Sequence, residues 1–321
     1  MTGIICGTGS YAPSYVMDNN EIATMVETSD EWIRERTGVV TRHIIKDETT
    51  VSMACEAATR ALADGDVDAR ELDLIIVSTI SSNIILPCTA CEVQKELAAE
   101  HATCFDMSAA CSGFVLAYNT ALAYLSGGIY KTALIIGSES LSNLTNWKDR
   151  GTCILFGDGA GAAVMRAGEG KTYFPVTCSD GMKGNALTCQ SRHTLADTRH
   201  MADPEYSIQM DGQAVFKFAV KKVPEAIDEA LKKNGVKKEE ITWYILHQAN
   251  SRIVEAVAKR LGEPLEKFPM NLQVYGNTSS ASIAILLDEM KRDGRLSGGQ
   301  KVVIAGFGAG LTWGASIIEW R

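Results

Sequence analysis

The chain has no excess of positive charge and no apolar run long enough to cross a bilayer. Its 321 residues carry 31 Lys and Arg against 39 Asp and Glu, which gives a net charge of −8 at pH 7. This balance argues against nucleic acid as a partner, because a phosphate backbone is bound by a basic surface. The N-terminus lacks a basic segment followed by an apolar one, so we expect neither a secretory signal nor a membrane partner.

The cysteines show no pattern of disulfide or metal pairing. There are nine, an odd number, and most stand singly within apolar segments. Cys88 and Cys91 form a C-x-x-C, but no second pair and no histidine pair completes a zinc site, so we interpret it as structural and predict no metal. Free thiols indicate a reducing compartment, and we expect a cytoplasmic location.

Apolar runs of strand length alternate with segments of helical periodicity along the chain. Hydrophobic residues make up 46% of the sequence and charged residues 22%, as in ordinary globular proteins. The pattern predicts strands at residues 4–11, 72–78, 132–139 and 156–164, and helices at 18–26, 29–36, 51–63 and 89–99. Such alternation predicts an α/β fold with a mainly parallel sheet covered on both faces.

The second half of the sequence repeats the plan of the first. Residues 240–247 match 71–78 at an offset of 169, and the strand at 301–306 matches 132–137 at the same offset. We infer two similar α/β halves.

The same offset places Cys111 on Ser280, within a second run of small residues. We expect the halves to be residues 1–168, with Cys111, and 169–321. The polar stretch 185–207 is expected to leave the core and to lie over a substrate path.

Cys111 lies in a run of small residues between a predicted strand and a predicted helix. The unpaired N–H groups and the positive dipole end of a helix start favour a thiolate and bind an oxyanion. Small neighbours leave room for a substrate carbonyl beside the sulfur. The alternative is a buried apolar cysteine, which is the more common role for this residue type.

Three further segments carry residues of chemical interest. His247 ends a predicted strand, where open α/β sheets bind ligands, although a structural histidine is equally consistent with its position. Asn277 lies in a glycine turn, where an asparagine often serves only as a cap. Residues 306–314 form a glycine-rich loop whose N–H groups suit an oxyanion, or a plain tight turn. Because each is expected to follow a strand, we predict that they converge with Cys111.

These motifs resemble those of the β-ketoacyl-acyl-carrier-protein synthase III family, and the likeness covers essentially the whole chain. The segments that carry it are Ala110-Cys111-Ser112-Gly113, His247-Gln248-Ala249-Asn250, Gly276-Asn277-Thr278-Ser279 and the final Gly-Phe-Gly-Ala-Gly-Leu-Thr-Trp-Gly. The resemblance implies a thiolase-like fold, in which two similar α/β halves stack as αβαβα, and a homodimer. It also implies the initiating condensing enzyme of type II fatty-acid synthesis.

The resemblance implies a two-stage reaction that needs no cofactor. Cys111 would accept an acyl group from acyl-coenzyme A, with acetyl-coenzyme A as the expected primer. The oxyanion would be held by the backbone N–H groups of Cys111 and Ala309. Malonyl-acyl-carrier protein would then lose carbon dioxide, and His247 and Asn277 would stabilise the enolate that attacks the acyl group. The products would be 3-ketoacyl-carrier protein, carbon dioxide and coenzyme A.

The resemblance also implies three sets of binding residues. Those expected to contact coenzyme A are Thr28, Trp32, Arg36, Arg150, Gly151, Phe216, Ala249 and Asn250. Those expected to dock the acidic carrier protein are Lys217, Gln248, Arg252 and Lys259, with Lys221 and Arg260 further out. For the lysines a solvated helix face is an equally good interpretation. Leu86, which would reach across the dimer, and Leu311 are expected in the acyl pocket.

Other classes of protein have some or all of the residues that correspond to Cys111, His247 and Asn277. Papain-like proteases have cysteine, histidine and asparagine in the same order, but the repeated α/β pattern and the absence of their Cys-Gly-Ser-Cys-Trp context disfavour them. Thiolases would have a second cysteine in the last glycine loop, and elongating synthases a histidine in place of Asn277. A binding protein without activity is disfavoured because all three residues are present. Polyketide or quinolone-type starter enzymes and hydroxymethylglutaryl-coenzyme A synthase share the set and remain as alternatives.

Overall fold

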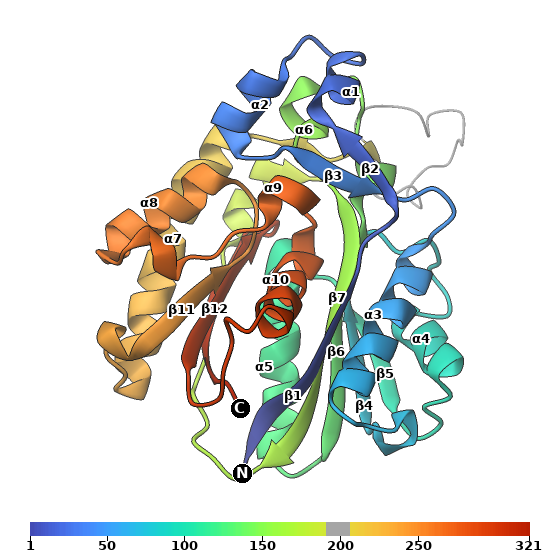
Figure 1. The fold of residues 1–321 in the computed structure, drawn as a ribbon, viewed down its shortest axis with the longest axis vertical. Helices are drawn as coiled ribbons and strands as arrows, with labels where there is room; N and C mark the ends of the chain where they lie inside the picture. Colours follow the sequence, from blue (N-terminus) through green and yellow to red (C-terminus); the bar gives the residue numbers. More distant parts are fainter. Residues whose placement is uncertain (191–205) are drawn as a thin grey trace.

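Two β-sheets form the centre of the molecule (Figure 1). The computed structural model describes residues 1–190 and 206–321. The first sheet contains, in spatial order, β1 (Thr2–Tyr11), β7 (Asp158–Gly168), β6 (Thr132–Ser140), β4 (Leu74–Ser78) and β5 (Thr103–Met107). The second contains β11 (Ile241–Leu246), β12 (Lys301–Gly308), β13 (Thr312–Glu319) and β8 (Val176–Ser179).

Helices lie on both faces of each sheet and complete a five-layer stack. Two helices pack between the sheets and contact both of them, namely α5 (Gly113–Ser126) and α10 (Ser282–Arg292). The outer face of the first sheet is covered by α3 (Thr50–Asp64) and α4 (Thr89–Leu97), and that of the second by α7 (Gly212–Asn234) and α8 (Ser251–Leu261). The αβαβα arrangement expected from the sequence is confirmed.

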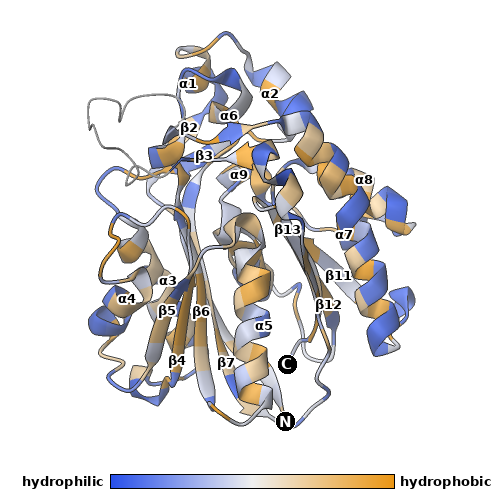
Figure 2. Cartoon of the chain, turned by 180° about the vertical axis from the view of Figure 1, so that it is seen from behind, coloured by the Kyte–Doolittle hydropathy of each residue, from blue (hydrophilic) through white to orange (hydrophobic). Residues whose placement is uncertain are grey.

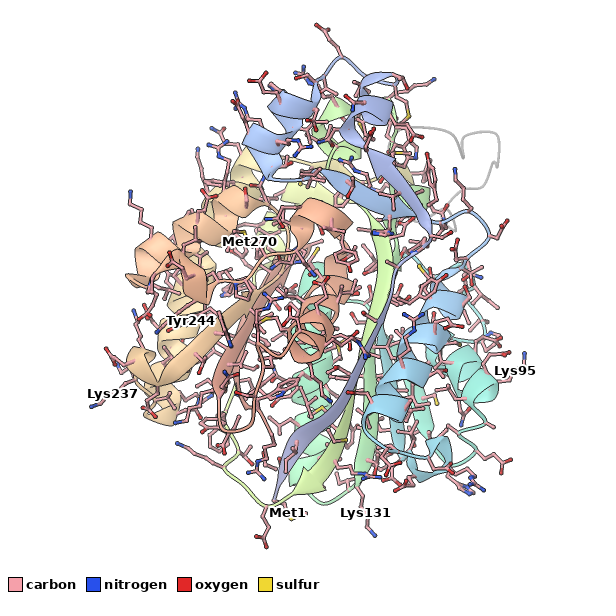
Figure 3. All side chains as sticks on the ribbon, viewed as in Figure 1. Met1, Lys95, Lys131, Lys237, Tyr244 and Met270 are labelled. Carbon is pink, nitrogen blue, oxygen red and sulfur yellow. The ribbon has the colours of Figure 1, made fainter. Side chains whose placement is uncertain are left out.

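The composition of each helix matches its layer. The central helix α5 has almost no charge and buries apolar side chains on several sides, Phe114 and Leu125 among them, and it is mostly orange in Figure 2. The outer helix α8 buries Ile253 and Val257 and exposes charged residues. Charged tips such as Lys95 and Lys237 project from the periphery, as Figure 3 shows.

The expectation of mainly parallel sheets is only partly met. Parallel pairing is found between β4 and β5, β4 and β6, and β11 and β12. In contrast, β7 runs antiparallel to β1 and β6, and β13 runs antiparallel to β12 and β8. The reason is plain for β12 and β13, because residues 309–311 form a tight connection too short for the crossover that parallel strands require.

Shorter elements gather at one end of the molecule, at the top of Figure 1. They are β2 (Tyr15–Asp18), α1 (Asn19–Ala23), α2 (Asp30–Thr37), β3 (Thr41–Ile44), α6 (Arg150–Cys153), β9 (Leu187–Thr188), β10 (Gln209–Met210) and α9 (Leu272–Tyr275). The helix predicted at 18–26 is shorter than expected. Most of the stretch 185–207 lies outside the described residues, and its flanks pair as β9 and β10.

The repeat seen in the sequence has a counterpart in the two central helices. A 3₁₀ turn at Ala110–Ser112 leads into α5, and a second at Ser279–Ala281 leads into α10, at the same offset of 169 residues. The first residue of each turn is left-handed, with φ of 45° at Ala110 and 47° at Ser279. The division into halves 1–168 and 169–321 stays a proposal.

Candidate active site

Cys111 lies between the carboxyl end of β5 and the amino end of α5. Its side chain is buried, with 9% of the residue exposed, and its sulfur lies 3.3 Å from Ser279 Oγ. Because Ser279 opens the matching turn before α10, the two 3₁₀ turns meet at the interface between the two sheets. The structure therefore puts the cysteine at the strand-to-helix junction that the sequence indicated.

Two glycines allow β12 to lie directly against the cysteine turn. A Cβ atom on Gly308 would come within 2.7 Å of Cys111 N and 3.2 Å of Cys111 Cβ. One on Gly306 would come within 3.1 Å of Cys111 O. Real Cβ atoms do not approach a backbone nitrogen so closely, so bare backbone is needed here. The start of the glycine-rich loop thus packs directly against the backbone of the Cys111 turn.

His247 follows β11 and faces the same space. Its backbone N–H donates to Ala305 O at 2.8 Å, which continues the ladder with β12, and the Phe307 ring packs edge-on against the imidazole at 5.4 Å. Nδ1 lies 2.8 Å from Ser282 Oγ. The residue is 2% exposed, and burial lowers the pKa of the imidazole to about 3, so His247 is neutral at physiological pH.

Asn277 follows the short helix α9, so the expectation that every site residue follows a strand is wrong for this one. Its backbone is fixed instead by long-range pairing, because Asn277 N–H donates to Leu155 O at 2.8 Å and Gly157 N–H donates to Asn277 O at 3.1 Å. The side-chain Oδ1 accepts the N–H of Ser279 at 2.9 Å. With the oxygen held, the amide NH₂ is the part of the side chain left to donate.

Burial opposes ionisation of the cysteine. It raises the pKa of the Cys111 thiol to about 12, and the buried Glu139 carboxylate acts in the same direction, although the hydrogen bond with Ser279 lowers it. Burial thus opposes the effect expected of the helix start, and the cost of desolvating the anion favours the neutral thiol in the resting site. The resting cysteine is a neutral thiol.

Cys111, His247 and Asn277 line one cavity of about 530 Å³. Seven other residues of the expected site line it as well: Arg36, Gly151, Phe216, Ala249, Asn250, Arg252 and Leu311. Apolar side chains such as Ile154 and Phe218 cover much of the remaining wall. The cavity thus combines an apolar passage with a few polar groups and with charged side chains, as is usual for ligand sites.

Three residues expected to bind coenzyme A lie outside this lining. The Trp32 ring is flanked by two guanidinium groups, with Arg150 Cζ 5.0 Å and Arg36 Cζ 5.6 Å from its centroid. Arg150 also donates to Glu27 O at 3.1 Å, and Thr28 lies beside that carbonyl in the chain, with its hydroxyl buried and unpartnered among the described residues. The Trp32 ring thus lies close to two positively charged groups.

The expected docking residues divide into exposed and buried ones. Lys217 on α7 and Arg252 and Lys259 on α8 are exposed, and the Arg252 guanidinium lies 6.0 Å from the Phe216 ring. Gln248 is only 1% exposed, so its expected contact with a carrier protein is wrong. Its amide donates to Leu246 O at 2.8 Å and accepts the N–H of Asn271 at 3.1 Å, which fixes the loop after His247.

Leu86, Ala309 and Leu311 lie in different surroundings. Leu311 is buried and lines the cavity, whereas Leu86 is 83% exposed and does not. Ala309 and Ala110 border a second hollow of about 800 Å³ on the other side of the cysteine turn, beside the loop that carries Ile85. Within the single chain Leu86 makes no part of an acyl pocket.

Sequence reasoning missed Ser279, Ser282 and Glu139. Glu139 at the end of β6 is fully buried and accepts hydrogen bonds from the Ser81 hydroxyl at 2.6 Å and the Ser280 hydroxyl at 2.9 Å. The signal for the serines was the polar small-residue run that matches the Cys111 turn. Among the described residues no group of three or more His, Cys, Asp or Glu side chains is arranged to hold a metal ion, and no helix could span a membrane.

Comparison with known proteins gives consistent matches. Two family models match, "3-Oxoacyl-[acyl-carrier-protein (ACP)] synthase III" over residues 105–181 and its C-terminal counterpart over residues 231–320. The beta-ketoacyl-[acyl-carrier-protein] synthase III of Desulfitobacterium hafniense (strain Y51) is 47% identical, and the alignment covers 98% of this chain and 97% of that protein.

Solved structures match along the whole fold. The 3-oxoacyl-[acyl-carrier-protein] synthase III of Aquifex aeolicus VF5 has a TM-score of 0.93 at 42% identity, covering 99% of this chain and 100% of that one. The priming β-ketosynthase of the R1128 polyketide pathway has a TM-score of 0.94 at 34% identity, covering 99% of this chain and 96% of that one.

Proposed function

The chain belongs to the 3-oxoacyl-[acyl-carrier-protein] synthase III family, and we propose that Cys111, His247 and Asn277 carry out its chemistry. Its role is that of the acyltransferase that starts fatty-acid synthesis by condensation. The observation that supports the residue assignment is their convergence on one cavity from three separate segments, with the cysteine at a helix start.

The first stage is transfer of an acyl group, with acetyl as the expected one, from coenzyme A to Cys111. The sulfur forms a bond to the thioester carbon, the bond from that carbon to the coenzyme A sulfur breaks, and the thiol proton leaves with coenzyme A. The carbonyl oxygen carries the negative charge in between, and backbone N–H groups of Cys111 and Ala309 are proposed to hold it. The bare backbone at Gly308 supports this, because it lets the start of the loop pack against the backbone of Cys111.

The second stage is condensation with malonyl-acyl-carrier protein. Its C–CO₂⁻ bond breaks, carbon dioxide leaves, and the electron pair forms an enolate whose oxygen needs hydrogen-bond donors. The Asn277 amide, with its oxygen held by Ser279, and the neutral His247 ring are proposed to donate. The enolate carbon then attacks the acyl carbonyl and the bond to Cys111 Sγ breaks with its electron pair on the sulfur. The sulfur takes a proton from solvent to restore the thiol, and 3-ketoacyl-carrier protein leaves.

The surroundings of the cavity support the substrate assignments. A cavity that is lined by Cys111 and also by the charged side chains of Arg36 and Arg252 suits an extended chain with an anionic end. Lys217, Arg252 and Lys259 offer positive charge to an acidic carrier protein, which steers its approach. A homodimer and a cytoplasmic location are also part of the proposal, the latter because all nine cysteines are free.

The division of labour is tested with Cys111→Ala. The variant should form no acyl adduct and no 3-ketoacyl product, because the nucleophile is gone. It should still release carbon dioxide from malonyl-carrier protein, because His247 and Asn277 remain, and release of labelled carbon dioxide measures this. Loss of both activities in a variant that remains folded would contradict the assignment. Discharge of the wild-type adduct by malonyl-coenzyme A alone would favour the related starter enzymes.

A further inference from the structure

Ser282, the first residue of α10, has a hydroxyl at the meeting point of three polar groups. It lies 2.8 Å from His247 Nδ1, accepts the N–H of Gln248 at 3.3 Å, and lies 2.9 Å from the carbonyl oxygen of Ser279. The residue is 2% exposed, so water does not compete freely for these contacts. One rotatable hydroxyl hydrogen therefore has two possible acceptors, Nδ1 and the Ser279 carbonyl.

Which acceptor the hydroxyl chooses decides whether His247 presents a hydrogen-bond donor or an acceptor to the cavity. The ring is neutral, so one nitrogen carries a hydrogen and the other a lone pair. Since Nδ1 faces Ser282, Nε2 is the nitrogen available to a ligand. Condensation needs a hydrogen-bond donor at Nε2, so the ring proton must lie on Nε2. Nδ1 then carries the lone pair and needs a neighbouring group that donates to it. Among the described residues the group in contact with Nδ1 is the Ser282 hydroxyl.

We propose that Ser282 is a positioning residue that donates its hydroxyl hydrogen to His247 Nδ1 and so keeps the ring proton on Nε2. The inference rests on the proposed function, since it explains how a neutral His247 acts as donor. Two contacts support this orientation. The Gln248 N–H already fills one lone pair of the hydroxyl, and the Ser279 carbonyl already accepts the backbone N–H of Ser282. The carbonyl is therefore not left unpaired when the hydroxyl turns to Nδ1.

The first half of the chain shows that the fold itself does not need this hydroxyl. At the offset of 169 residues, Ser78 takes the place of His247 and Gly113 the place of Ser282. A Cβ atom on Gly113 would fall 1.8 Å from Ser78 Oγ, so that site excludes any side chain, yet α5 begins there as α10 begins at Ser282. The hydroxyl is thus present in the half that has the histidine, and it is not required for a helix to begin at this position.

The test compares Ser282→Ala with Ser282→Thr, which keeps a hydroxyl, and with Ser280→Ala. Ser280 is the matched control, because its buried hydroxyl lies in the same turn but contacts Ser78 O and Glu139 and not His247. We expect S282A to slow decarboxylation of malonyl-carrier protein about 10- to 100-fold, since a misplaced donor costs somewhat less than a missing one. Acylation of Cys111 by acyl-coenzyme A should be unchanged, and S282T should recover decarboxylation.

Nitrogen-15 spectra of the histidine ring give a readout that a purely structural role would not move. With the His247 signals identified by His247→Ala, the wild-type spectrum should show the proton on Nε2, and S282A should show it shared with Nδ1. A wild-type proton on Nδ1 overturns the proposal, as does an equal loss of decarboxylation in S282A and S280A. If S282A does not fold, the wild-type spectrum still decides. Failure of the proposed function appears separately, as a wild-type Cys111 that takes up no acyl group.

Discussion

Burial shifts the pKa values of Cys111 and His247 in opposite directions. It raises the pKa of the Cys111 thiol to about 12 and lowers the pKa of the His247 imidazole to about 3. Both shifts favour the uncharged form, so at neutral pH the resting site holds a thiol and a neutral ring. In the proposed reaction, charge develops only when a thioester is bound, on the oxygen that the backbone N–H groups are proposed to hold.

The protonation state of Cys111 predicts how its alkylation depends on pH. Because the thiol pKa lies far above neutrality, the thiolate fraction should rise about tenfold for each pH unit between 7 and 9, and the rate of labelling by iodoacetamide should rise with it. Peptide mass spectrometry at Cys111 measures the rate, with the exposed Cys178 as an internal comparison. A plateau near neutral pH would mean that the helix start outweighs burial.

His247 should matter for condensation and not for acylation. His247→Ala should still take up the acyl group on Cys111, because the proposed oxyanion hole consists of backbone N–H groups. It should lose about 100- to 1000-fold in the condensation rate, as when one oxyanion donor is removed. Intact-protein mass spectrometry and product formation measure the two stages. Absence of an acyl adduct in the folded variant would show that the histidine has a different role.

Among the secondary-structure elements, the end of β12 packs against the cysteine turn and holds it in place. Gly308→Ala would place a Cβ atom 2.7 Å from Cys111 N, so the strand or the turn must shift. We expect a loss of about 1–3 kcal/mol in the free energy of unfolding and impaired acylation. Gly298→Ala is the control, because nothing lies within 4 Å of its Cβ position. Urea unfolding and the rate of adduct formation test both, and a G308A variant as active as G298A would contradict the close approach.

Helices α7 and α8 carry the charges proposed to dock the carrier protein. Arg252→Glu reverses a charge at the cavity, and we expect it to raise the KM for malonyl-carrier protein about tenfold. Lys232→Glu makes the same change in charge on the exposed surface of α7, about 22 Å along the helix from Lys217, and should have little effect.

The effect of Arg252 on coenzyme A must be measured separately, because the residue also lines the cavity. Rates of Cys111 acylation by acyl-coenzyme A provide that measurement. An equal loss with both substrates would mean that Arg252 serves the passage and not the docking surface.

At the scale of the whole molecule, the sequence predicted those features of the fold that depend on local signals and on periodicity. The internal repeat indicated two similar α/β halves, and the central helices begin at matching 3₁₀ turns, so the predicted helix starts at Cys111 and at its counterpart were placed correctly. The antiparallel β7 was missed because strand order depends on pairing between distant segments. The expectation that Asn277 follows a strand and the exposure expected of Gln248 failed for the same reason, since the pairing with Leu155 and the burial of the amide are long-range contacts.

The proposed homodimer is a prediction at the same scale. Leu86 and its neighbour Ile85 are exposed apolar residues on the loop that borders the second hollow. Light scattering should give about twice the chain mass of 34.6 kDa, and Leu86→Asp should lower it. Ile129→Asp, which changes an exposed isoleucine elsewhere, is the control. A wild-type monomer would contradict the dimer, and equal effects of both variants would contradict the role of Leu86.

The central claim is that Cys111 carries the acyl group between the two stages. Intact-protein mass spectrometry after mixing the protein with a panel of acyl-coenzyme A esters tests it most directly. We predict that one ester adds its acyl mass at Cys111 and that malonyl-carrier protein then removes the adduct as a 3-ketoacyl product. A protein that forms no adduct with any ester would contradict the account.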